Sequence, residues 1–306
     1  MNTDFYYKLK ELLPSAEIAY DEPMSRHTTF RLGGETDVFI KISEEKQLAI
    51  LIPELVQNNI PYYIIGKGSN LLVSDKGFRG VVIRLGDSFE SVKVNHCNVT
   101  AGAGASMAQI AKIAHMNSLT GFEFAAGIPG SIGGGVIMNA GAYDGELKDV
   151  VKRVRFMDRN GLIKEYTGEE MRFDYRTSAL KGKPEYIVLE VEMELQPGEG
   201  EVILSKMQEL ARRRKEKQPL EYPSAGSTFK RPKGYFAGKL IGDAGLAGYT
   251  VGGAKVSEKH NGFVINAGEA TAEDVKKIIE EIRQKVYDEF QVMLEPEVIF
   301  LGEFTE

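Results

Sequence analysis

The chain has almost no cysteine, no long apolar run and no excess of positive charge. A single cysteine, Cys97, excludes an internal disulfide and is typical of a protein in a reducing compartment. No stretch approaches the roughly 20 apolar residues that a membrane span needs. Asp4, Lys8, Lys10 and Glu11 interrupt the segment where a secretory signal would have its apolar core. We therefore expect a cytoplasmic protein with no membrane partner.

The charge balance argues against a nucleic-acid partner. Lys and Arg number 38 and Asp and Glu number 44, so the formal net charge is −6. Proteins that coat nucleic acids usually present a net positive face. The four histidines, His27, His96, His115 and His260, are scattered without the spacing of metal ligands, so no metal site is expected.

The length and composition predict a globular α+β protein with more than one domain. The chain has 306 residues, of which 42% are hydrophobic and 27% charged. Helical apolar spacing occurs at 43–56, where Pro53 marks a kink or a late start, and about 107–116, 201–216, 237–244 and 272–289. Strand patterns occur near 62–65, 97–101, 151–158, 186–194, 262–266 and 294–302. The turn-rich stretch QPGEGEV (196–202) predicts a boundary between two regions.

Glycine is concentrated in one segment, AAGIPGSIGGGVIMNAGAYDG (125–145). Seven of its twenty-one residues are glycine, against 33 in the whole chain. Glycine costs stability unless something must approach the backbone closely, and Pro129 breaks any continuous helix here. A bare loop can turn several N–H groups towards one anion. Together with a second loop that has few side chains, GKGSN (66–70), the segment predicts a site that binds the two phosphates of a dinucleotide. The alternative is a tight crossover between strands that binds no ligand.

Two other glycine-bearing stretches match phosphate-binding motifs poorly. GAGAS (102–106) begins like a dinucleotide fingerprint, but Met107 stands where the third glycine belongs. GYFAGKLIG (234–242) is one residue short of a P-loop, and Leu240 replaces the required Ser or Thr. We assign neither of them a phosphate.

Three polar residues stand out by context. Arg176 follows Tyr175 in FDYRTS, where its planar fork suits a carboxylate. Ser227 lies in the small-residue loop PSAGSTF, and Glu297 lies in LEPEVIF, within an expected apolar closing strand. Taken singly, each is more typical of surface, turn or strand structure than of catalysis.

Taken together, the motifs resemble a known family. GKGSNLLV, EFAAGIPGSIGGGVIMNAGAY, DYRTS, PSAGSTFKRP, AGKLI and LEPEV occur in the order seen in the UDP-N-acetylenolpyruvoylglucosamine reductases, the MurB family. The resemblance covers roughly Arg26 to Gly302. It implies an FAD-binding fold of the vanillyl-alcohol-oxidase (PCMH) type in two subdomains, 1–70 and 71–197. A smaller α+β substrate-binding domain, 198–306, would return its last strand to the active site.

The resemblance also implies the cofactor and the residues around it. FAD would be bound without a covalent link, and NADPH would be the co-substrate. The implied FAD-binding residues are Gly66, Lys67, Gly68, Ser69, Asn70, Gly127, Ile128, Pro129, Gly130, Ser131, Gly133, Gly134, Asn139, Ala140 and Gly141.

The implied reaction reduces the enolpyruvyl group of UDP-N-acetylglucosamine-enolpyruvate to give UDP-N-acetylmuramate, a peptidoglycan precursor. Arg176 matches the arginine that polarises the substrate carboxylate, Glu297 the acid that assists, and Ser227 the proton donor. The implied substrate-binding residues are Tyr175, Lys217, Lys230, Arg231 and Lys239.

One departure bears on the subtype, and two other functions stay open. After Tyr175 and Arg176 the chain has only a short loop, which resembles the type II form and leaves open which residue covers the uridine; 255–261 is one candidate. Another FAD-dependent oxidase or dehydrogenase of this fold, acting on a carbohydrate or alcohol, is the first alternative. A nucleotide-sugar-binding regulator without catalysis is the second.

Overall fold

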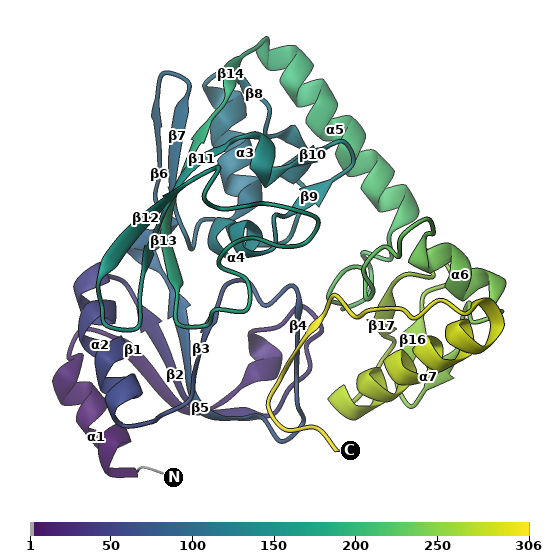
Figure 1. Ribbon diagram of the computed structural model, residues 1–306, viewed down its shortest axis with the longest axis horizontal. Coiled ribbons are helices and arrows are strands. Elements are labelled where there is room, and N and C mark those ends of the chain that lie inside the picture. The colour runs from purple at the N-terminus through teal and green to yellow at the C-terminus, as the bar shows by residue number, and fades with distance from the viewer. Residues whose placement is uncertain (1–2, 306) are drawn as a thin grey trace. The chain divides into compact units, whose positions relative to one another are not determined.

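The computed structural model (Figure 1) describes residues 3–305. The chain divides into two compact units. Unit 1 comprises the chain up to Tyr20, Val38–Lys67 and Gly80–Arg213. Unit 2 comprises Asp21–Asp37, Gly68–Arg79 and the chain from Arg214 on. Each unit has its own cluster of buried hydrophobic residues. The units interleave along the chain, whereas the division at 70/71 and 197/198 stays a prediction.

Helices and strands alternate along much of the chain, which confirms the predicted α+β class. The α-helices are α1 (Thr3–Leu12), α2 (Glu45–Gln57), α3 (Met107–Met116), α4 (Ile132–Ile137), α5 (Gly200–Lys217), α6 (Ala237–Asp243) and α7 (Ala272–Phe290). The 3-10 helices are η1 (Met24–Arg26), η2 (Asp87–Glu90), η3 (Glu123–Ala125) and η4 (Leu147–Asp149). The strands are β1 (Glu17–Pro23), β2 (Glu35–Ile42), β3 (Tyr62–Ile65), β4 (Leu71–Val73), β5 (Phe78–Leu85), β6 (Val92–Asn95), β7 (Asn98–Gly102), β8 (Leu119–Thr120), β9 (Gly141–Ala142), β10 (Gly145–Glu146), β11 (Val151–Met157), β12 (Ile163–Thr167), β13 (Ile187–Glu194), β14 (Gln196–Pro197), β15 (Thr250–Val251), β16 (Ala254–Val256), β17 (Val264–Asn266) and β18 (Ile299–Leu301).

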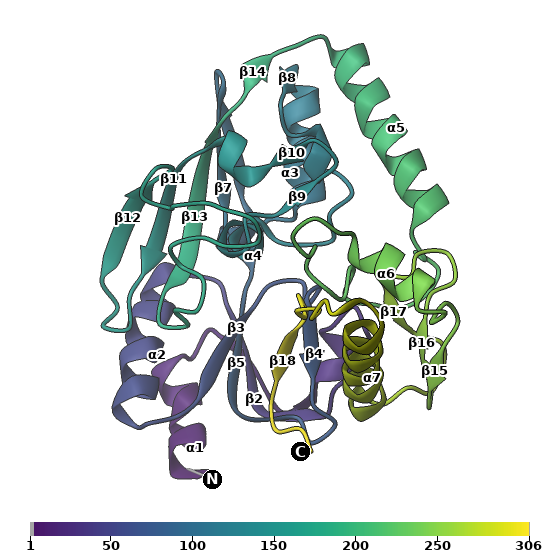
Figure 2. The same ribbon diagram turned by 45° about the vertical axis from the view of Figure 1, so that its right-hand side comes forward.

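Four strands form a sheet in the order β1-β2-β5-β3, and α1 and α2 lie beside this sheet (Figure 2). Leu48, Leu51 and Leu55 recur at helical spacing on α2, and all three are fully buried in the core cluster of unit 1. The helix runs on through Pro53 to Gln57, so the proline does not mark a late start.

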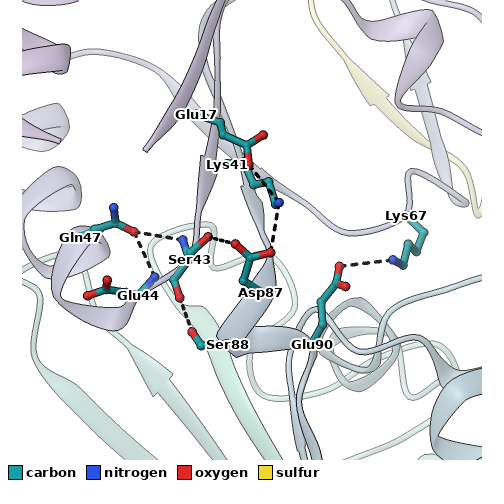
Figure 3. A network of polar contacts seen from close by, with 9 residues as sticks. All are labelled: Glu17, Lys41, Ser43, Glu44, Gln47, Lys67, Asp87, Ser88 and Glu90. Atoms are coloured by element: carbon teal, nitrogen blue, oxygen red, sulfur yellow. Dashed lines mark hydrogen bonds and ion pairs between the residues drawn. The ribbon is translucent and has the colours of Figure 1, made fainter. Parts of the chain in front are cut away.

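Polar side chains fasten the first turn of α2 to this sheet (Figure 3). The Lys41 ammonium lies 3.1 Å from carboxylate oxygens of both Asp87 and Glu17, and these hydrogen bonds raise the pKa of Lys41. Hydrogen bonds from Ser43 and Lys41 lower the pKa of Asp87. In the first turn of α2, the Gln47 side chain accepts the backbone N–H of Ser43 at 3.0 Å. The network ties β2, η2 and α2 together.

Unit 1 also contains a five-stranded antiparallel sheet in the order β12-β11-β13-β7-β6. Val191 of β13 lies opposite Ala101 of β7 and Val154 of β11, and all three side chains are fully buried. α3 and α4 contribute Ile110 and Val136 to the same core cluster. The strands predicted near 97–101, 151–158 and 186–194 are confirmed here.

Unit 2 is built on the antiparallel sheet β15-β16-β17, against which α7 packs (Figure 1). Val275, Ile279, Ile282 and Val286 recur on one face of α7 and are at most 1% exposed. A separate parallel pair joins β4 to β18, with Leu71 opposite Ile299. Within residues 3–305, no helix is long and apolar enough to cross a membrane.

The first turn of α7 is capped by a carboxylate from a distant segment. Asp75 accepts the backbone N–H of Ala272 at 2.8 Å and that of Glu273 at 3.0 Å. These N–H groups have no partner inside the helix, and a carboxylate there also interacts favourably with the helix dipole.

We expect Asp75→Ala to lower the free energy of unfolding by about 1 kcal/mol, because it removes both capping bonds. Urea denaturation followed by far-UV circular dichroism measures this loss. The control is Lys76→Ala, which changes the exposed neighbour and leaves the cap in place. Equal stability of Asp75→Ala and the wild type would contradict a stabilising cap.

Candidate functional site

Packing accounts for several glycines of the 125–145 segment. A Cβ at Gly133 would lie 2.8 Å from the Cβ of Ala103, and one at Gly145 would lie 2.5 Å from a ring carbon of Phe124. A Cβ at Gly135 would lie 3.1 Å from the Leu147 side chain. The fold alone therefore favours glycine at Gly133 and Gly145, whether or not a ligand binds, and leaves little room for a side chain at Gly135.

Gly134 has no such packing reason. It is exposed, and a Cβ there would meet only the Ser131 hydroxyl oxygen, at 3.6 Å. It also lies inside α4, where alanine is the better residue by about 1 kcal/mol. The segment is therefore not the continuous loop expected from the sequence: Pro129 stops any helix before it, and α4 begins at Ile132.

Several polar hydrogens of the 127–134 segment have no hydrogen-bond partner among the residues that the structure describes. Among residues 3–305, the backbone N–H groups of Gly127, Ser131 and Gly134 donate no hydrogen bond. The Ser131 hydroxyl makes none either, although Ser131 is only 4% exposed. Buried donors, such as those of Ser131, are normally satisfied. These residues thus fit a diphosphate, whose oxygens accept several N–H and O–H hydrogen bonds.

The first bare loop adjoins this cluster within unit 1. A Cβ at Gly66 would lie 2.3 Å from the Ser131 hydroxyl oxygen, so the end of β3 approaches the 127–134 segment closely. The next residue, Lys67, is held by Glu90, whose carboxylate lies 3.6 Å from the ammonium (Figure 3). Unit 1 thus brings Gly66, Lys67 and Ser131 of the predicted cofactor residues together.

The GAGAS stretch supports the glycine-rich segment. The N–H of Ile132 donates to the carbonyl of Ala105, and the N–H of Gly133 donates to that of Ala103, both at 2.9 Å. In return, Met107 donates to the carbonyl of Gly130 at 3.0 Å. The sequence analysis missed this supporting role, which depends on contacts 23 to 30 residues apart along the chain.

Asn139 serves the fold with its side chain. It is fully buried, and its amide donates to Glu146 at 2.8 Å and to the carbonyl of Asp174 at 3.2 Å. Its side-chain oxygen accepts the N–H of Lys148 at 2.9 Å. FAD binding by Asn139, Ala140 and Gly141 stays a prediction. Because the Asn139 side chain is bonded within the protein, only its backbone would contact the cofactor.

A tight turn presents Arg176 beside this segment. Asp174 and Thr177 exchange backbone hydrogen bonds of 3.1 and 3.2 Å, and Arg176 has a left-handed backbone with φ of +52°. The guanidinium carbon lies 5.3 Å from the ring centre of Tyr175, and a guanidinium nitrogen lies 3.5 Å from the carbonyl of Gly141. The turn therefore holds Arg176 and Tyr175 next to Gly141 in unit 1.

In unit 2, Gly68 and Asn70 have clear structural reasons. Gly68 has φ of +61°, and a Cβ there would lie 2.0 Å from the carbonyl oxygen of His27. The Asn70 amide donates to the carbonyl of Glu297 at 3.0 Å, and the N–H of Ile299 donates to the carbonyl of Asn70 at 3.0 Å. Asn70 thus fixes the backbone that carries Glu297. Binding of the cofactor by Gly68, Ser69 and Asn70 stays a prediction.

The same unit brings Ser227 and Glu297 onto neighbouring segments. Thr228, which is fully buried, accepts the N–H of Glu297 at its carbonyl at 2.8 Å. It also donates to the carbonyl of Gly262 at 2.8 Å and accepts the N–H of Val264 at its hydroxyl at 2.9 Å. Ser227 itself is exposed, and its hydroxyl has no hydrogen bond within residues 3–305. The fold thus anchors the backbone and leaves this hydroxyl available.

The expectation that Glu297 belongs to the closing strand is wrong. β18 begins only at Ile299, because Pro296 has no N–H and the segment before it bonds elsewhere. The carbonyl of Glu295 accepts the N–H of Lys230 at 2.9 Å, and Phe229 and Pro296 form an isolated bridge. Glu297 lies in the connection between this bridge and β18.

The predicted substrate cations of unit 2 have varied surroundings. Lys217 ends α5 and is exposed. Lys230 forms an ion pair with Glu295, and the Arg231 guanidinium stacks 4.0 Å above the ring of Phe236. Lys239 of α6 pairs with Asp243 at 2.6 Å. Their contact with a diphosphate stays a prediction.

Two family models match the chain. Residues 36–167 match a model described as FAD binding domain. Residues 218–301 match a model described as UDP-N-acetylenolpyruvoylglucosamine reductase, C-terminal domain. The predicted cofactor residues lie inside the first range, and the Ser227–Glu297 region lies inside the second.

Curated relatives carry the same name as the second model. The UDP-N-acetylenolpyruvoylglucosamine reductase of Caldanaerobacter subterraneus subsp. tengcongensis is 53% identical over 97% of both chains. The proteins of that name from Lachnoclostridium phytofermentans and Clostridioides difficile are each 51% identical over 99% of both chains.

Solved structures show the same relationship in the fold. The MurB crystal structure from Thermus caldophilus is 34% identical, covers 94% of this chain and 99% of its own, and superimposes with a TM-score of 0.80. Phl p 4, a glucose oxidase variant that is 15% identical, covers 64% of this chain with a TM-score of 0.50, which shows a shared fold alone. The FAD-binding fold expected from the sequence is confirmed. The chain belongs to the UDP-N-acetylenolpyruvoylglucosamine reductase (MurB) family.

Proposed function

We propose that this protein catalyses the NADPH-dependent reduction of UDP-N-acetylglucosamine-enolpyruvate to UDP-N-acetylmuramate in the cytoplasm. Its family membership supports the reaction class, because near full-length relatives carry the reductase name. The observation that carries the proposal is the Thr228–Glu297 hydrogen bond of 2.8 Å. This bond joins the segment that carries Glu297 to the residue after Ser227, whose hydroxyl makes no hydrogen bond within residues 3–305.

The residues around Ser131 would hold FAD, which supplies hydride transfer when it is bound. The N–H groups of Gly127, Ser131 and Gly134 and the Ser131 hydroxyl would donate to the diphosphate. Lys67, beside Glu90, would add positive charge to the same loop. The open space at Gly134 supports this placement, because a side chain there would occupy the approach to these donors.

Arg176 would hold the substrate carboxylate and stabilise the negative charge that develops beside it. A guanidinium offers a planar pair of donors to a carboxylate, and a preorganised cation is among the strongest means of stabilising such charge. Tyr175 stacks beside the guanidinium and would limit its motion.

Ser227 would donate the proton to the second carbon of the enolpyruvyl group. A serine hydroxyl is a weak acid, so it protonates only a very basic carbon and needs a nearby cation to offset the alkoxide. Lys217 is our candidate for this cation, and Glu297 would assist at the same centre. The segments that carry Ser227 and Glu297 meet in unit 2 through Thr228.

A direct assay tests this function. Purified protein with FAD should oxidise NADPH rapidly only when UDP-N-acetylglucosamine-enolpyruvate is present, as followed by the loss of absorbance of NADPH. UDP-N-acetylglucosamine, which lacks the enolpyruvyl group, is the control. Oxidation that does not depend on the enolpyruvyl substrate would contradict the proposal.

Gly134 separates cofactor binding from stability. We expect Gly134→Ala to stabilise the flavin-free protein by about 0.5–1 kcal/mol, because alanine is favoured in a helix. The same change should weaken FAD binding by roughly tenfold or more, since a hydrogen bond to a charged group contributes about 1.5–3 kcal/mol and about 1.4 kcal/mol is tenfold in affinity. Titration of FAD fluorescence and thermal unfolding of the flavin-free protein measure the two effects.

The control for this experiment is Gly200→Ala in the first turn of α5, where the nearest atom to a new Cβ is 4.0 Å away. It should leave FAD affinity unchanged. If Gly134→Ala bound FAD as tightly as the wild type, the diphosphate would have to lie elsewhere.

A further inference from the structure

The Lys181 ammonium contacts the backbone of Arg176. Its Nζ atom donates to the Arg176 carbonyl oxygen at 2.6 Å, and both residues are partly buried. A hydrogen bond from an ammonium is stronger than one between neutral groups, especially away from bulk water.

The contact falls on a residue whose backbone needs support. Arg176 adopts φ of +52°, a conformation that costs energy for any residue with a Cβ. The turn from Asp174 to Thr177 imposes this conformation, and the N–H of Tyr175 donates to the Asp174 carboxylate at 2.7 Å within it. An ammonium on the Arg176 carbonyl fixes the orientation of the peptide that follows.

Residues between Arg176 and Lys181 fasten the same loop to α4. The Ser178 hydroxyl donates to the carbonyl of Ile137 at 2.9 Å and accepts the N–H of Leu180 at 3.3 Å. The N–H of Lys181 donates to the carbonyl of Ser178 at 3.1 Å. The backbone of Lys181 is therefore held in place by Ser178, and the Lys181 side chain bonds back to the Arg176 carbonyl at the start of the same loop.

We propose that Lys181 is a positioning residue for Arg176 in the reduction step. The inference rests on the proposed function and adds to it a residue that acts through the arginine backbone. The guanidinium stands at the end of several rotatable bonds, so a small rotation of the Arg176 peptide moves it far from a substrate carboxylate. Catalysis is sensitive to displacements of this kind.

Lys181→Met removes the ammonium and keeps most of the apolar stem. We expect flavin reduction by NADPH to stay normal. Oxidation of the reduced enzyme by the enolpyruvyl substrate should slow by roughly tenfold. Affinity for UDP-N-acetylmuramate, measured from the change in flavin absorbance, should fall similarly, because the product carries the carboxylate that Arg176 would hold. Lys181→Arg should restore a large part of both.

The matched control is Lys183→Met, which removes the same charge from an exposed position two residues on. It should resemble the wild type in both half-reactions. Lys181→Met with wild-type rates and product affinity would overturn the inference. So would equal slowing of both half-reactions with a lower melting temperature, which shows a structural role. A wild type that reduces flavin and leaves the substrate unreduced would contradict the proposed function itself, and the inference with it.

Discussion

Ser227→Ala is expected to slow oxidation of the reduced flavin by the enolpyruvyl substrate by about 10²–10⁴-fold, the range that loss of a positioned general acid typically costs in rate. Reduction of the flavin by NADPH should remain nearly normal, since that step needs no proton from this hydroxyl. Stopped-flow absorbance of the flavin follows each half-reaction separately. The hydroxyl makes no hydrogen bond within residues 3–305, so its removal should leave thermal stability unchanged.

A neighbouring serine provides the control for this experiment. Ser224→Ala changes the same loop, but the Ser224 contact with Thr29 is made by its backbone carbonyl, at 2.6 Å, and is kept in the variant. Ser224→Ala should therefore react like the wild type. Equal slowing of both half-reactions in Ser227→Ala would assign Ser227 to structure and contradict its role as the proton donor.

Arg176→Ala is expected to slow the same half-reaction by about 10²–10³-fold, because it removes the cation proposed to stabilise the developing charge. Flavin content and the rate of flavin reduction should not change, since the turn that carries Arg176 is held by backbone hydrogen bonds. Arg176→Lys should recover little activity, because a lysine cannot bind a carboxylate with two parallel hydrogen bonds. Stopped-flow traces and the FAD-to-protein absorbance ratio measure these effects.

Arg172→Ala is the matched control, because Arg172 is exposed in the same segment and also has a left-handed backbone, with φ of +45°. The two variants therefore remove the same side chain from similarly strained positions. Loss of bound FAD in Arg176→Ala would contradict a role at the substrate carboxylate and would place Arg176 in cofactor binding.

The features that the sequence predicted well are those set by local patterns. α3 was expected at about 107–116 and runs from Met107 to Met116, because its apolar residues recur at helical spacing between a serine cap and a turn. α7 was expected at 272–289 and ends one residue later, at Phe290. At both helices, local helix propensity and the burial of one face favour the same structure, so contacts with residues distant in the sequence hardly alter where the helix begins and ends.

The features that it predicted poorly depend on distant neighbours. Gly133 and Gly145 need glycine because of Ala103 and Phe124, and no local pattern separates them from Gly134, which has open space. Glu297 was placed in a strand because LEPEVIF is apolar around it, but the segment bonds to Lys230 and Thr228 before β18 begins. For the candidate site, the family motifs predicted which residues to consider, whereas the contacts that support those residues could be seen only in the structure.

The interleaving of the two units has a consequence for synthesis on the ribosome. Unit 2 needs Asp21–Asp37 and Gly68–Arg79 as well as the chain from Arg214 on, and Leu71 finds its strand partner only at Ile299. Contacts so far apart in sequence form late and leave apolar surface uncovered meanwhile. The nascent early segments of unit 2, including Phe30 and Leu72 of its core, therefore stay without their partners until the chain from Arg214 to Ile299 has been synthesised. Chaperone demand during biosynthesis should accordingly be concentrated on this unit.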